Sequence, residues 1–313
     1  MELFENLIVE LTTLCNLKCI HCGYKLIKPH QEIDKDYLVD IVLRLKPLGI
    51  QTVMFTGGEP TLYSELIEIA RFCKQEKLHV KIATNGSNLE PIITLLNEAT
   101  LDELVISVDA VQPMTYKSIR GRNLLHQIFS FIQGYPQFSN RIHVSYLIQR
   151  NNYKELIPFL HQCQSLKIAG VSLLVPHLGG DFTSLIDYTN YRKQVFLSNG
   201  EIDEFRNVIG PQLREFYILH PQVFKCSPKH IDALIDYLSN PDTSHFFRSG
   251  ICSFPLKTIF LYSNGEVSLC PYHPDWKNDF NVLLSDIKTY RMRCVFEGKD
   301  RNSYCRHCLE VPL

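Results

Sequence analysis

Short apolar runs alternate with longer amphipathic segments over the first half of the chain. Residues 7–11 read as a buried strand, and apolar residues at helical spacing over 36–46 predict a helix after it. The alternation continues to about residue 175 and predicts six strands with five helices between them. The further strands are predicted at 52–55, 79–84, 104–108, 142–148 and 171–175, and the further helices at 62–73, 89–96, 124–132 and 153–166.

Repeated strand–helix units predict an α/β fold with a parallel sheet and right-handed crossovers. The strand at 104–108 has almost no polar alternation, which is typical of a parallel strand that helices cover. Six such units suit a partial (β/α)6 barrel of the TIM type. Barrels of this type place their functional residues at the carboxyl ends of the strands.

The pattern weakens after residue 178. Two helices are expected near 202–216 and 228–238, and this region is interpreted as a helical insert or linker, with a substrate lid as the alternative. Two short strands then flank Ser263-Asn264-Gly265, a hairpin turn signal. The predicted division is a barrel at 1–178, a helical insert at 179–250 and a small cysteine-rich domain with a β-hairpin and a helix at 251–313.

Composition argues against several classes of protein. The net charge is −1, so nothing points to nucleic acid or to an anionic membrane surface. No apolar run approaches about 18 residues, and the N-terminus lacks the features of a signal peptide. We therefore expect a cytoplasmic protein that does not bind membranes. Its 11 cysteines are expected to be reduced thiols.

Three cysteines follow the first predicted strand directly. Cys15, Cys19 and Cys22 have the spacing C-x3-C-x2-C. Soft thiolate ligands match iron, and one loop can present three of them to a [4Fe–4S] cluster. Because such a cluster has four irons, three cysteines leave one iron open to a small molecule. A three-cysteine zinc site is the alternative.

A glycine-rich segment ends the second predicted strand. Gly57, Gly58, Glu59 and Pro60 are expected at the same edge of the sheet as the three cysteines. Glycines let the backbone approach a ligand closely, and Glu59 can accept hydrogen bonds from an amine. An ordinary Gly-Pro turn with a surface glutamate is the alternative.

These two motifs resemble those of the radical S-adenosylmethionine (SAM) enzymes, with His21 at the aromatic position of the cysteine motif. The resemblance implies that SAM chelates the open iron through its amino and carboxylate groups. An electron from the cluster would then cleave SAM to methionine and a 5′-deoxyadenosyl radical. A reductase such as flavodoxin or ferredoxin is implied as the partner.

The resemblance also implies individual SAM contacts. Glu59, within the glycine-rich segment, would bind the methionine amino group, and His21 would pack against the adenine. Ser107 and Asp109, at the end of the fourth predicted strand, would contact the ribose and the carboxylate.

Two arginines and an asparagine are further candidates for the SAM site. Arg120 and Arg122 lie in an arginine–glycine segment after the fourth strand, where a guanidinium can form paired hydrogen bonds with the SAM carboxylate. Solvated surface arginines are the alternative. Asn85 follows the third predicted strand.

Four later cysteines form a second pattern. Cys252 and Cys270 are spaced C-x12-G-x4-C, and Cys305 and Cys308 follow as C-x2-C. The pattern resembles the twitch domain, a shorter relative of the SPASM domain, which implies an auxiliary [4Fe–4S] cluster on these four cysteines. A structural zinc site is the alternative. Only an iron–sulfur cluster could accept an electron from a substrate radical.

The remaining cysteines are assigned separately. Cys73 and Cys163 fall on apolar helix faces and are expected in the core. Cys226, with Cys294 as the second choice, is the candidate hydrogen-atom donor if the enzyme is an epimerase. A cysteine without a catalytic role is the alternative.

The predicted function is a radical SAM enzyme of the oxidoreductase or epimerase type, acting on a small hydroxylated metabolite such as a sugar or cyclitol. A peptide-modifying enzyme is the alternative. Many such enzymes carry a leader-binding domain of about 80 residues, and a first strand near residue 7 leaves no room for it, which favours small molecules. A non-catalytic iron–sulfur or zinc protein is a third hypothesis, and the Gly57–Pro60 segment argues against it.

Overall fold

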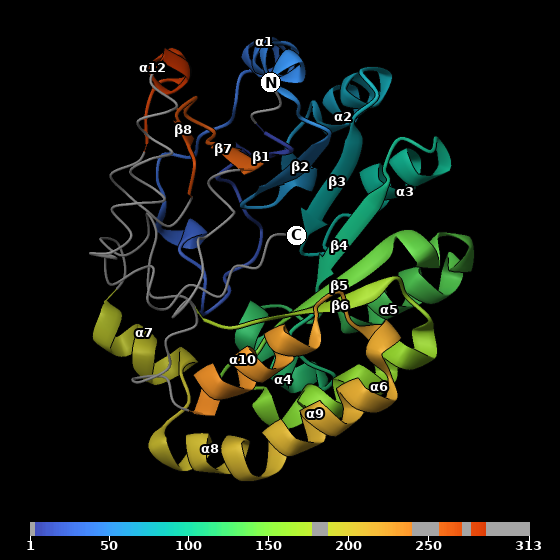
Figure 1. Cartoon of the computed structure of the whole chain (residues 1–313), viewed down its shortest axis with the longest axis vertical. Helices are drawn as coiled ribbons and strands as arrows, with labels where there is room; N and C mark the ends of the chain where they lie inside the picture. Colours follow the sequence, from blue (N-terminus) through green and yellow to red (C-terminus); the bar gives the residue numbers. More distant parts are fainter. Residues whose placement is uncertain (1–3, 177–186, 240–256, 271–276, 286–313) are drawn as a thin grey trace.

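One sheet of eight strands organises the part of the chain that the computed structural model describes, namely residues 4–176, 187–239, 257–270 and 277–285 (Figure 1). The strand order is β6-β5-β4-β3-β2-β1-β7-β8. Neighbouring strands are parallel, except that β7 and β8 form an antiparallel hairpin. Six consecutive parallel strands confirm the predicted α/β partial barrel.

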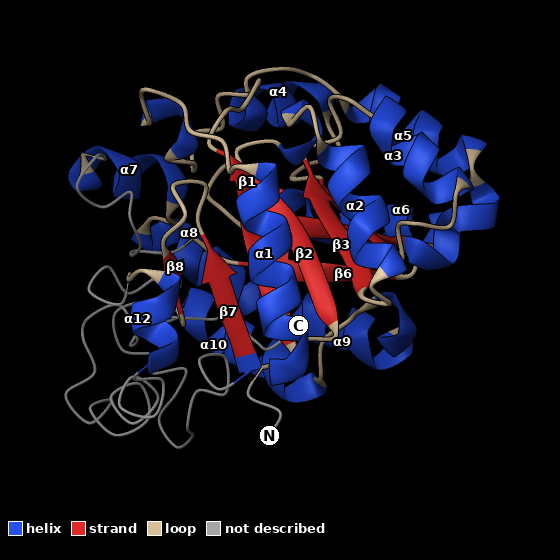
Figure 2. Ribbon diagram, turned by 90° about the horizontal axis from the view of Figure 1, so that it is seen from above, coloured by secondary structure: helices blue, strands red, loops and turns tan. Residues whose placement is uncertain are grey.

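The six barrel strands lie within two residues of their predicted positions. They are β1 (Asn6–Thr12), β2 (Thr52–Gly57), β3 (His79–Thr84), β4 (Glu103–Ser107), β5 (Ile142–Leu147) and β6 (Gly170–Leu174). The helices that cover the outer face of this sheet follow the chain order (Figure 2). They are α1 (Lys35–Leu45), α2 (Leu66–Gln75), α3 (Glu90–Asn97), α5 (Leu125–Gly134) and α6 (Leu156–Leu166). Helix α4 (Pro113–Arg120) lies instead at the end of the sheet toward which β1 points (Figure 2).

Helix α4 is the one barrel helix that the apolar pattern did not predict. Its boundary signals are nevertheless present, because Pro113 occupies the first turn and Gly121 ends the helix in the left-handed conformation. Short 3-10 helices also join the elements, and one of them, η3 (Pro60–Leu62), follows β2 directly.

The core lies between the outer face of the sheet and the covering helices. In β4, Leu104 and Ile106 are fully buried on that side, whereas Val105 and Ser107 on the inner face are half-buried. The inner face is therefore the side on which a ligand can be held. Among the described residues, no helix combines the length and apolarity needed to cross a bilayer.

The predicted helical insert packs on the flank of the barrel beyond β6. It consists of α7 (Tyr188–Val195), α8 (Asn199–Glu204), the π-helix η6 (Phe205–Ile209), α9 (Gly210–Leu219) and α10 (Pro228–Ser239). Helices α8 and α9 run on through η6, and α9 contacts both α6 and α10. Phe205 and Leu213 are fully buried in this layer.

The C-terminal hairpin extends the barrel sheet. Strand β7 (Thr258–Leu261) pairs in parallel with β1, and β8 (Val267–Ser268) pairs with β7; α12 (Phe280–Ser285) follows. The predicted hairpin and helix are confirmed. The sequence did not indicate that β7 of this hairpin forms backbone hydrogen bonds with β1 of the barrel. The twitch-type domain as a whole stays a prediction, because most of 251–313 lies outside the described residues.

A buried carboxylate links this hairpin to the barrel. Glu10 of β1 is 6% exposed. It accepts hydrogen bonds from the Tyr24 hydroxyl at 2.5 Å and from the Ser263 hydroxyl at 2.7 Å. The backbone N–H of Ser263 donates to it as well, at 3.2 Å. One side chain thus connects the β7–β8 turn with the loop that follows Cys22.

Replacing Glu10 by Ala is expected to lower the free energy of unfolding by about 2–4 kcal/mol, because it removes the buried carboxylate to which the Tyr24 hydroxyl and the Ser263 hydroxyl and N–H donate. The matched control is Glu5→Ala, which removes an exposed partner of Lys257 and should cost less than about 1 kcal/mol. Urea titration of both variants gives the comparison. Equal losses in the two would contradict the assigned role of Glu10.

Candidate active site

The three cysteines lie on the loop between β1 and α1, at the carboxyl end of β1. Backbone hydrogen bonds hold this loop on two sides: Glu59 N donates to Leu14 O at 2.8 Å, and Ile20 N donates to Ile119 O at 2.9 Å. Cys19 is 7% exposed, and Cys15 and Cys22 are half-buried. The loop is therefore fixed by the ends of β2 and α4.

Two side chains direct N–H groups toward the sulfurs. Asn85 Nδ2 lies 3.7 Å from Cys15 Sγ, and Arg120 Nη1 lies 3.9 Å from Cys19 Sγ. Burial raises the pKa of Cys19 to about 12, with Arg120 acting in the opposite direction. Burial raises the pKa of Cys15 and Cys22 as well. Such thiols lose their protons when a metal coordinates them.

The donor set fits an iron–sulfur cluster. All three candidate ligands are soft sulfurs, and donors directed at sulfur are a feature of iron–sulfur sites. No three His, Cys, Asp or Glu side chains among the described residues surround a single ion position. A [4Fe–4S] cluster does not require that convergence, because each cysteine binds a different iron.

The two glycines of the Gly57-Gly58-Glu59-Pro60 segment allow β2 to pass directly beside the cysteine loop. A Cβ atom on Gly57 would lie less than 3.0 Å from the backbone oxygen of Thr12, and one on Gly58 equally close to that of Leu14. Gly57 also has φ +128°, which favours glycine. Gly58 N donates to Thr12 O at 2.7 Å. These glycines are thus required by the approach of the two backbones.

Glu59 is fully buried and satisfies several donors of the protein itself. Its Oε1 accepts from the hydroxyls of Thr61 and Thr84, both at 2.6 Å, and from Thr61 N at 3.1 Å. Its Oε2 accepts from Asn85 N at 2.7 Å. Glu59 therefore joins the end of β2 to the end of β3, and the adjoining Pro60 is buried in η3.

Asp109 and Arg120 form a buried ion pair beside Cys19. Asp109 is 1% and Arg120 7% exposed, and Arg120 Nη2 lies 2.5 Å from Asp109 Oδ2. Burial opposes the charge of Arg120, but Asp109, Cys19 and Tyr116 together outweigh this effect and raise the pKa of the arginine. The guanidinium thus lies between a carboxylate and a cluster cysteine. Asp109 Oδ1 accepts from Leu147 N at 2.9 Å.

His21 lies between Asp109 and a glutamine that the sequence analysis missed. His21 Nε2 is 4.0 Å from Asp109 Oδ2, and His21 Nδ1 is 3.3 Å from Gln149 Nε2. Burial lowers the pKa of His21 to about 4, with Asp109 acting in the opposite direction. The imidazole is therefore neutral near pH 7. Gln149 lies two residues after β5, as Asp109 does after β4, so the rule that selected Asp109 would also have found Gln149.

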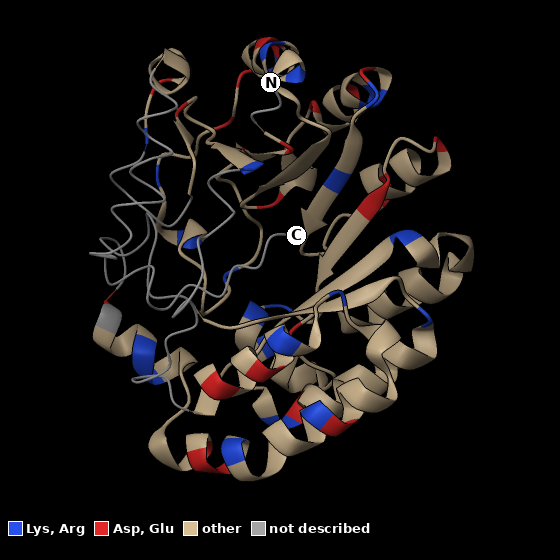
Figure 3. Cartoon of the chain, in the orientation of Figure 1, with Lys and Arg blue, Asp and Glu red and all other residues tan. Residues whose placement is uncertain are grey.

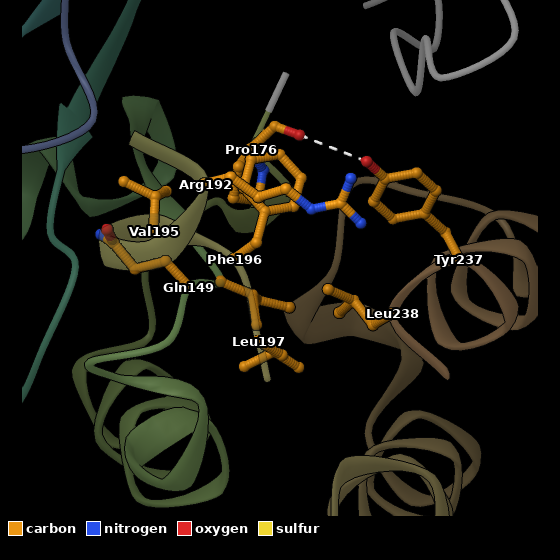
Figure 4. A pocket seen from close by; sticks show the side chains of 9 residues that line it. Gln149, Pro176, Arg192, Val195, Phe196, Leu197, Tyr237 and Leu238 are labelled. Atoms are coloured by element: carbon orange, nitrogen blue, oxygen red, sulfur yellow. Dashed lines mark hydrogen bonds between the residues drawn. The ribbon is translucent and has the colours of Figure 1, made fainter. Parts of the chain in front are cut away.

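Gln149 also lines a small cavity between the barrel and the helical insert (Figure 4). The other walls come from Pro176 after β6, Arg192 of α7, and Tyr237 of α10, whose hydroxyl donates to Pro176 O at 3.4 Å. Helix α7 contacts the cysteine loop as well, because the Tyr191 hydroxyl donates to His21 O at 3.3 Å. The insert thus borders the site.

The remaining predicted residues are placed as follows. Ser107, at the end of β4, accepts a hydrogen bond from the Ser145 hydroxyl at 3.3 Å. Arg122 is exposed, two residues beyond the end of α4, and takes no part in the buried ion pair. Cys73 and Cys163 are buried in the core, as predicted.

Cys226 is not brought to the cysteine loop. The preceding residue, Lys225, donates its N–H to Val171 O at 3.2 Å and its Nζ to Glu103 at 2.7 Å, at the amino-terminal ends of β6 and β4. Burial raises the Cys226 pKa to about 11. Of the second cysteine pattern, Cys270 is half-buried after β8. Cys252, Cys294, Cys305 and Cys308 lie outside the described residues.

Comparison with known proteins decides the family. The model of the radical SAM superfamily matches residues 9–162, which include the cysteine loop and the sheet edge around it. The chain belongs to the radical SAM superfamily. SAM and a [4Fe–4S] cluster are therefore its cofactors, in agreement with the sequence.

A solved structure supports the radical SAM fold. Streptococcus suis SuiB bound to S-adenosylmethionine superposes with a TM-score of 0.70, covering 98% of this chain and 72% of SuiB. The sequence identity is 15%, so this likeness concerns the fold alone.

Two relatives carry the same name. The chain is 29% identical over 294 residues to a probable GTP 3′,8-cyclase of Sulfolobus acidocaldarius, covering 90% of this chain and 85% of the relative. It is 36% identical over 135 residues to a probable GTP 3′,8-cyclase of Pyrococcus abyssi, covering 41% of this chain and 42% of that protein.

These names correct the predicted reaction. Oxidation or epimerisation of a sugar or cyclitol was expected, whereas the relatives are named for a cyclisation of GTP. The expectation was wrong, and the role of Cys226 as hydrogen-atom donor to an epimerised substrate loses its basis. The cysteine and Gly57–Pro60 motifs concern the cofactor and carry no information on the substrate.

Replacing Gly58 by Ala is expected to lower the free energy of unfolding of the cluster-free protein by about 2–4 kcal/mol, because the new Cβ meets the Leu14 backbone. Gly134→Ala is the control. A Cβ there meets nothing within 4 Å, so that variant should be neutral or more stable by up to about 1 kcal/mol. Thermal denaturation without iron separates this structural role from a contact with SAM; similar melting temperatures would disprove it.

Replacing Cys15, Cys19 and Cys22 together by Ala should remove about four irons per chain and abolish reductive SAM cleavage. Iron and sulfide analysis after anaerobic reconstitution, with 5′-deoxyadenosine measured in parallel, provides the readout. The control is Cys73→Ala, at a buried cysteine outside the site. This variant should have the same iron content as the wild type. Residual 5′-deoxyadenosine in the triple variant would refute the ligand assignment.

Proposed function

We propose that this radical SAM enzyme acts on a purine nucleoside triphosphate, with GTP as its substrate and ring closure as its reaction. The proposal rests on one combination. The cysteine loop, the Gly57–Pro60 segment and the polar ends of β3, β4 and β5 meet at one edge of the sheet, in a chain whose relatives are named GTP 3′,8-cyclase.

When bound, SAM on the [4Fe–4S] cluster supplies a 5′-deoxyadenosyl radical. Cys15, Cys19 and Cys22 would hold that cluster. Arg120 places a positive charge beside Cys19, and neutral His21, oriented by Gln149, presents a flat ring at the rim of the site. These residues bind and orient, and the buried ends of β4 and β5 exclude water from them.

A row of serines on the inner face of the sheet suits a hydroxylated, phosphorylated substrate. Ser107 of β4 pairs with Ser145 of β5, and Ser145 pairs with Ser172 of β6, so their side chains lie on one face. Hydroxyls both donate and accept, which matches ribose hydroxyls and phosphate oxygens. The row lies within two residues of the carboxyl ends of these strands.

The four C-terminal cysteines are proposed to hold an auxiliary [4Fe–4S] cluster. Support comes from their spacing and from Cys270, which follows a hairpin hydrogen-bonded to β1, the strand that leads into the cysteine loop. The alternative is a zinc site, and metal analysis of the triple cysteine variant distinguishes the two.

Incubation of the reconstituted enzyme with SAM, dithionite and GTP deuterated at C3′ should place deuterium in 5′-deoxyadenosine. It should also convert GTP into a cyclised product that mass spectrometry detects. ATP under the same conditions is the comparison substrate. If GTP neither stimulates SAM cleavage nor transfers deuterium, the assigned substrate is wrong. SAM cleavage in the absence of GTP would still support membership of the radical SAM superfamily.

Ser145→Ala serves as a companion variant. It should raise the KM for GTP about threefold to tenfold through the loss of one hydrogen bond. Ser139→Ala, in the exposed 3-10 helix η4 (Pro136–Arg141), should leave the KM unchanged.

A further inference from the structure

Two long stretches around the cysteine loop contain no acidic residue. Residues 11–31 include Lys18, Lys25 and Lys28 but no Asp or Glu. Residues 110–154 include six Lys or Arg and again no Asp or Glu. Because the whole chain has a net charge of −1, this local excess of positive charge is offset elsewhere.

The structure brings these two stretches together. The hydrogen bond from Ile20 N to Ile119 O joins the cysteine loop to the last turn of α4. Gly121, which ends α4, packs on Lys18: a Cβ built on it would lie 3.6 Å from Lys18 N and 3.7 Å from Lys18 Cβ. Figure 2 shows α4 at the end of the molecule toward which β1 points.

The exposed side of this junction is cationic. Lys18, Lys117 and Arg122 are all exposed, and within the described part of the chain no carboxylate lies within ion-pair distance of them. On the outer helices α1 and α2, by contrast, Figure 3 shows acidic and basic residues next to one another. The acidic contacts of α4 are the buried Asp109, which pairs with Arg120, and Glu155, which accepts from Val111 N and Gln112 N just before the first turn of the helix.

An apolar side chain accompanies the cations. Met114 is 76% exposed and lies one helical turn before Lys117 on α4. Adaptable methionines are common at surfaces that bind other proteins. A cationic surface that includes an apolar residue suits a protein partner better than the uniform charge of a nucleic acid.

We propose that the surface formed by Lys18, Lys117, Arg122 and Met114 is the docking site of a small, acidic one-electron carrier protein. The surface covers the loop that holds Cys15, Cys19 and Cys22, so a carrier seated there is close to the group that must be reduced. In the transfer, one electron leaves the reduced carrier and one enters the iron–sulfur site; no atom moves between the proteins. Electrostatic attraction to this surface speeds encounter and orients the carrier.

The test measures binding of a purified acidic flavodoxin to the reconstituted holoenzyme, at about 50 and about 300 mM KCl. Lys18→Glu/Lys117→Glu should weaken binding at low salt about tenfold or more, and added salt should weaken wild-type binding but have little effect on the variant. Lys229→Glu, at the exposed start of α10 on the helical insert, is the matched control and should bind as wild type does.

Formation of 5′-deoxyadenosine provides the second readout and needs no GTP, so it tests docking separately from the proposed substrate. In the double variant, the rate of flavodoxin-driven SAM cleavage should fall as flavodoxin binding weakens. The rate of dithionite-driven cleavage should stay at the wild-type value. Equal flavodoxin binding by the double variant and Lys229→Glu would overturn the proposal. So would a parallel loss of dithionite-driven cleavage, or tighter binding of a DNA duplex than of flavodoxin to the wild type.

Discussion

The candidate site depends on the contact between two backbones at the ends of β1 and β2. Gly58 N and Glu59 N donate to Thr12 O and Leu14 O, and these bonds exist only because neither Gly57 nor Gly58 carries a Cβ. The contact fixes the start of the cysteine loop. It also places Glu59 where its carboxylate can reach the end of β3, which in turn places Asn85 beside Cys15.

A second constraint is electrostatic. A buried arginine beside Cys19 would be costly without a counter-ion, and Asp109 supplies one at 2.5 Å. Because both buried charges lose their hydration, the ion pair adds little net stability to the fold. Its position is more informative: a cation facing a cluster ligand favours thiolate over thiol, as Arg120 does for Cys19. Arg120 therefore lies beside the cysteine loop, and its contact with the SAM carboxylate stays a prediction.

The sequence predicted the barrel well because each strand is a short apolar run ended by a turn signal, and each helix except α4 has an apolar stripe. It predicted the cysteines and the Gly57–Pro60 segment because their spacing is itself the signal. The sequence could not predict that β7 pairs with β1, because no local pattern indicates pairing between strands about 250 residues apart, such as Asn6 with Thr258. Gln149 and the ion pair between Asp109 and Arg120 were not foreseen for a related reason, because long-range polar partners depend on how strands and helices meet.

The wrong prediction of the reaction has a structural cause. The residues that form the recognisable motifs lie at the carboxyl edge of β1 and β2, where they serve the cofactor. The serine row that we assign to the substrate lies on the inner face of β4, β5 and β6, where single hydroxyls occur at ordinary strand spacing and form no motif. In our proposal, the motifs that follow β1 and β2 serve the cofactor and the inner face of β4 to β6 binds the substrate, and only the first set forms a recognisable sequence motif. The same radical-generating edge can therefore support different reactions when the inner face changes.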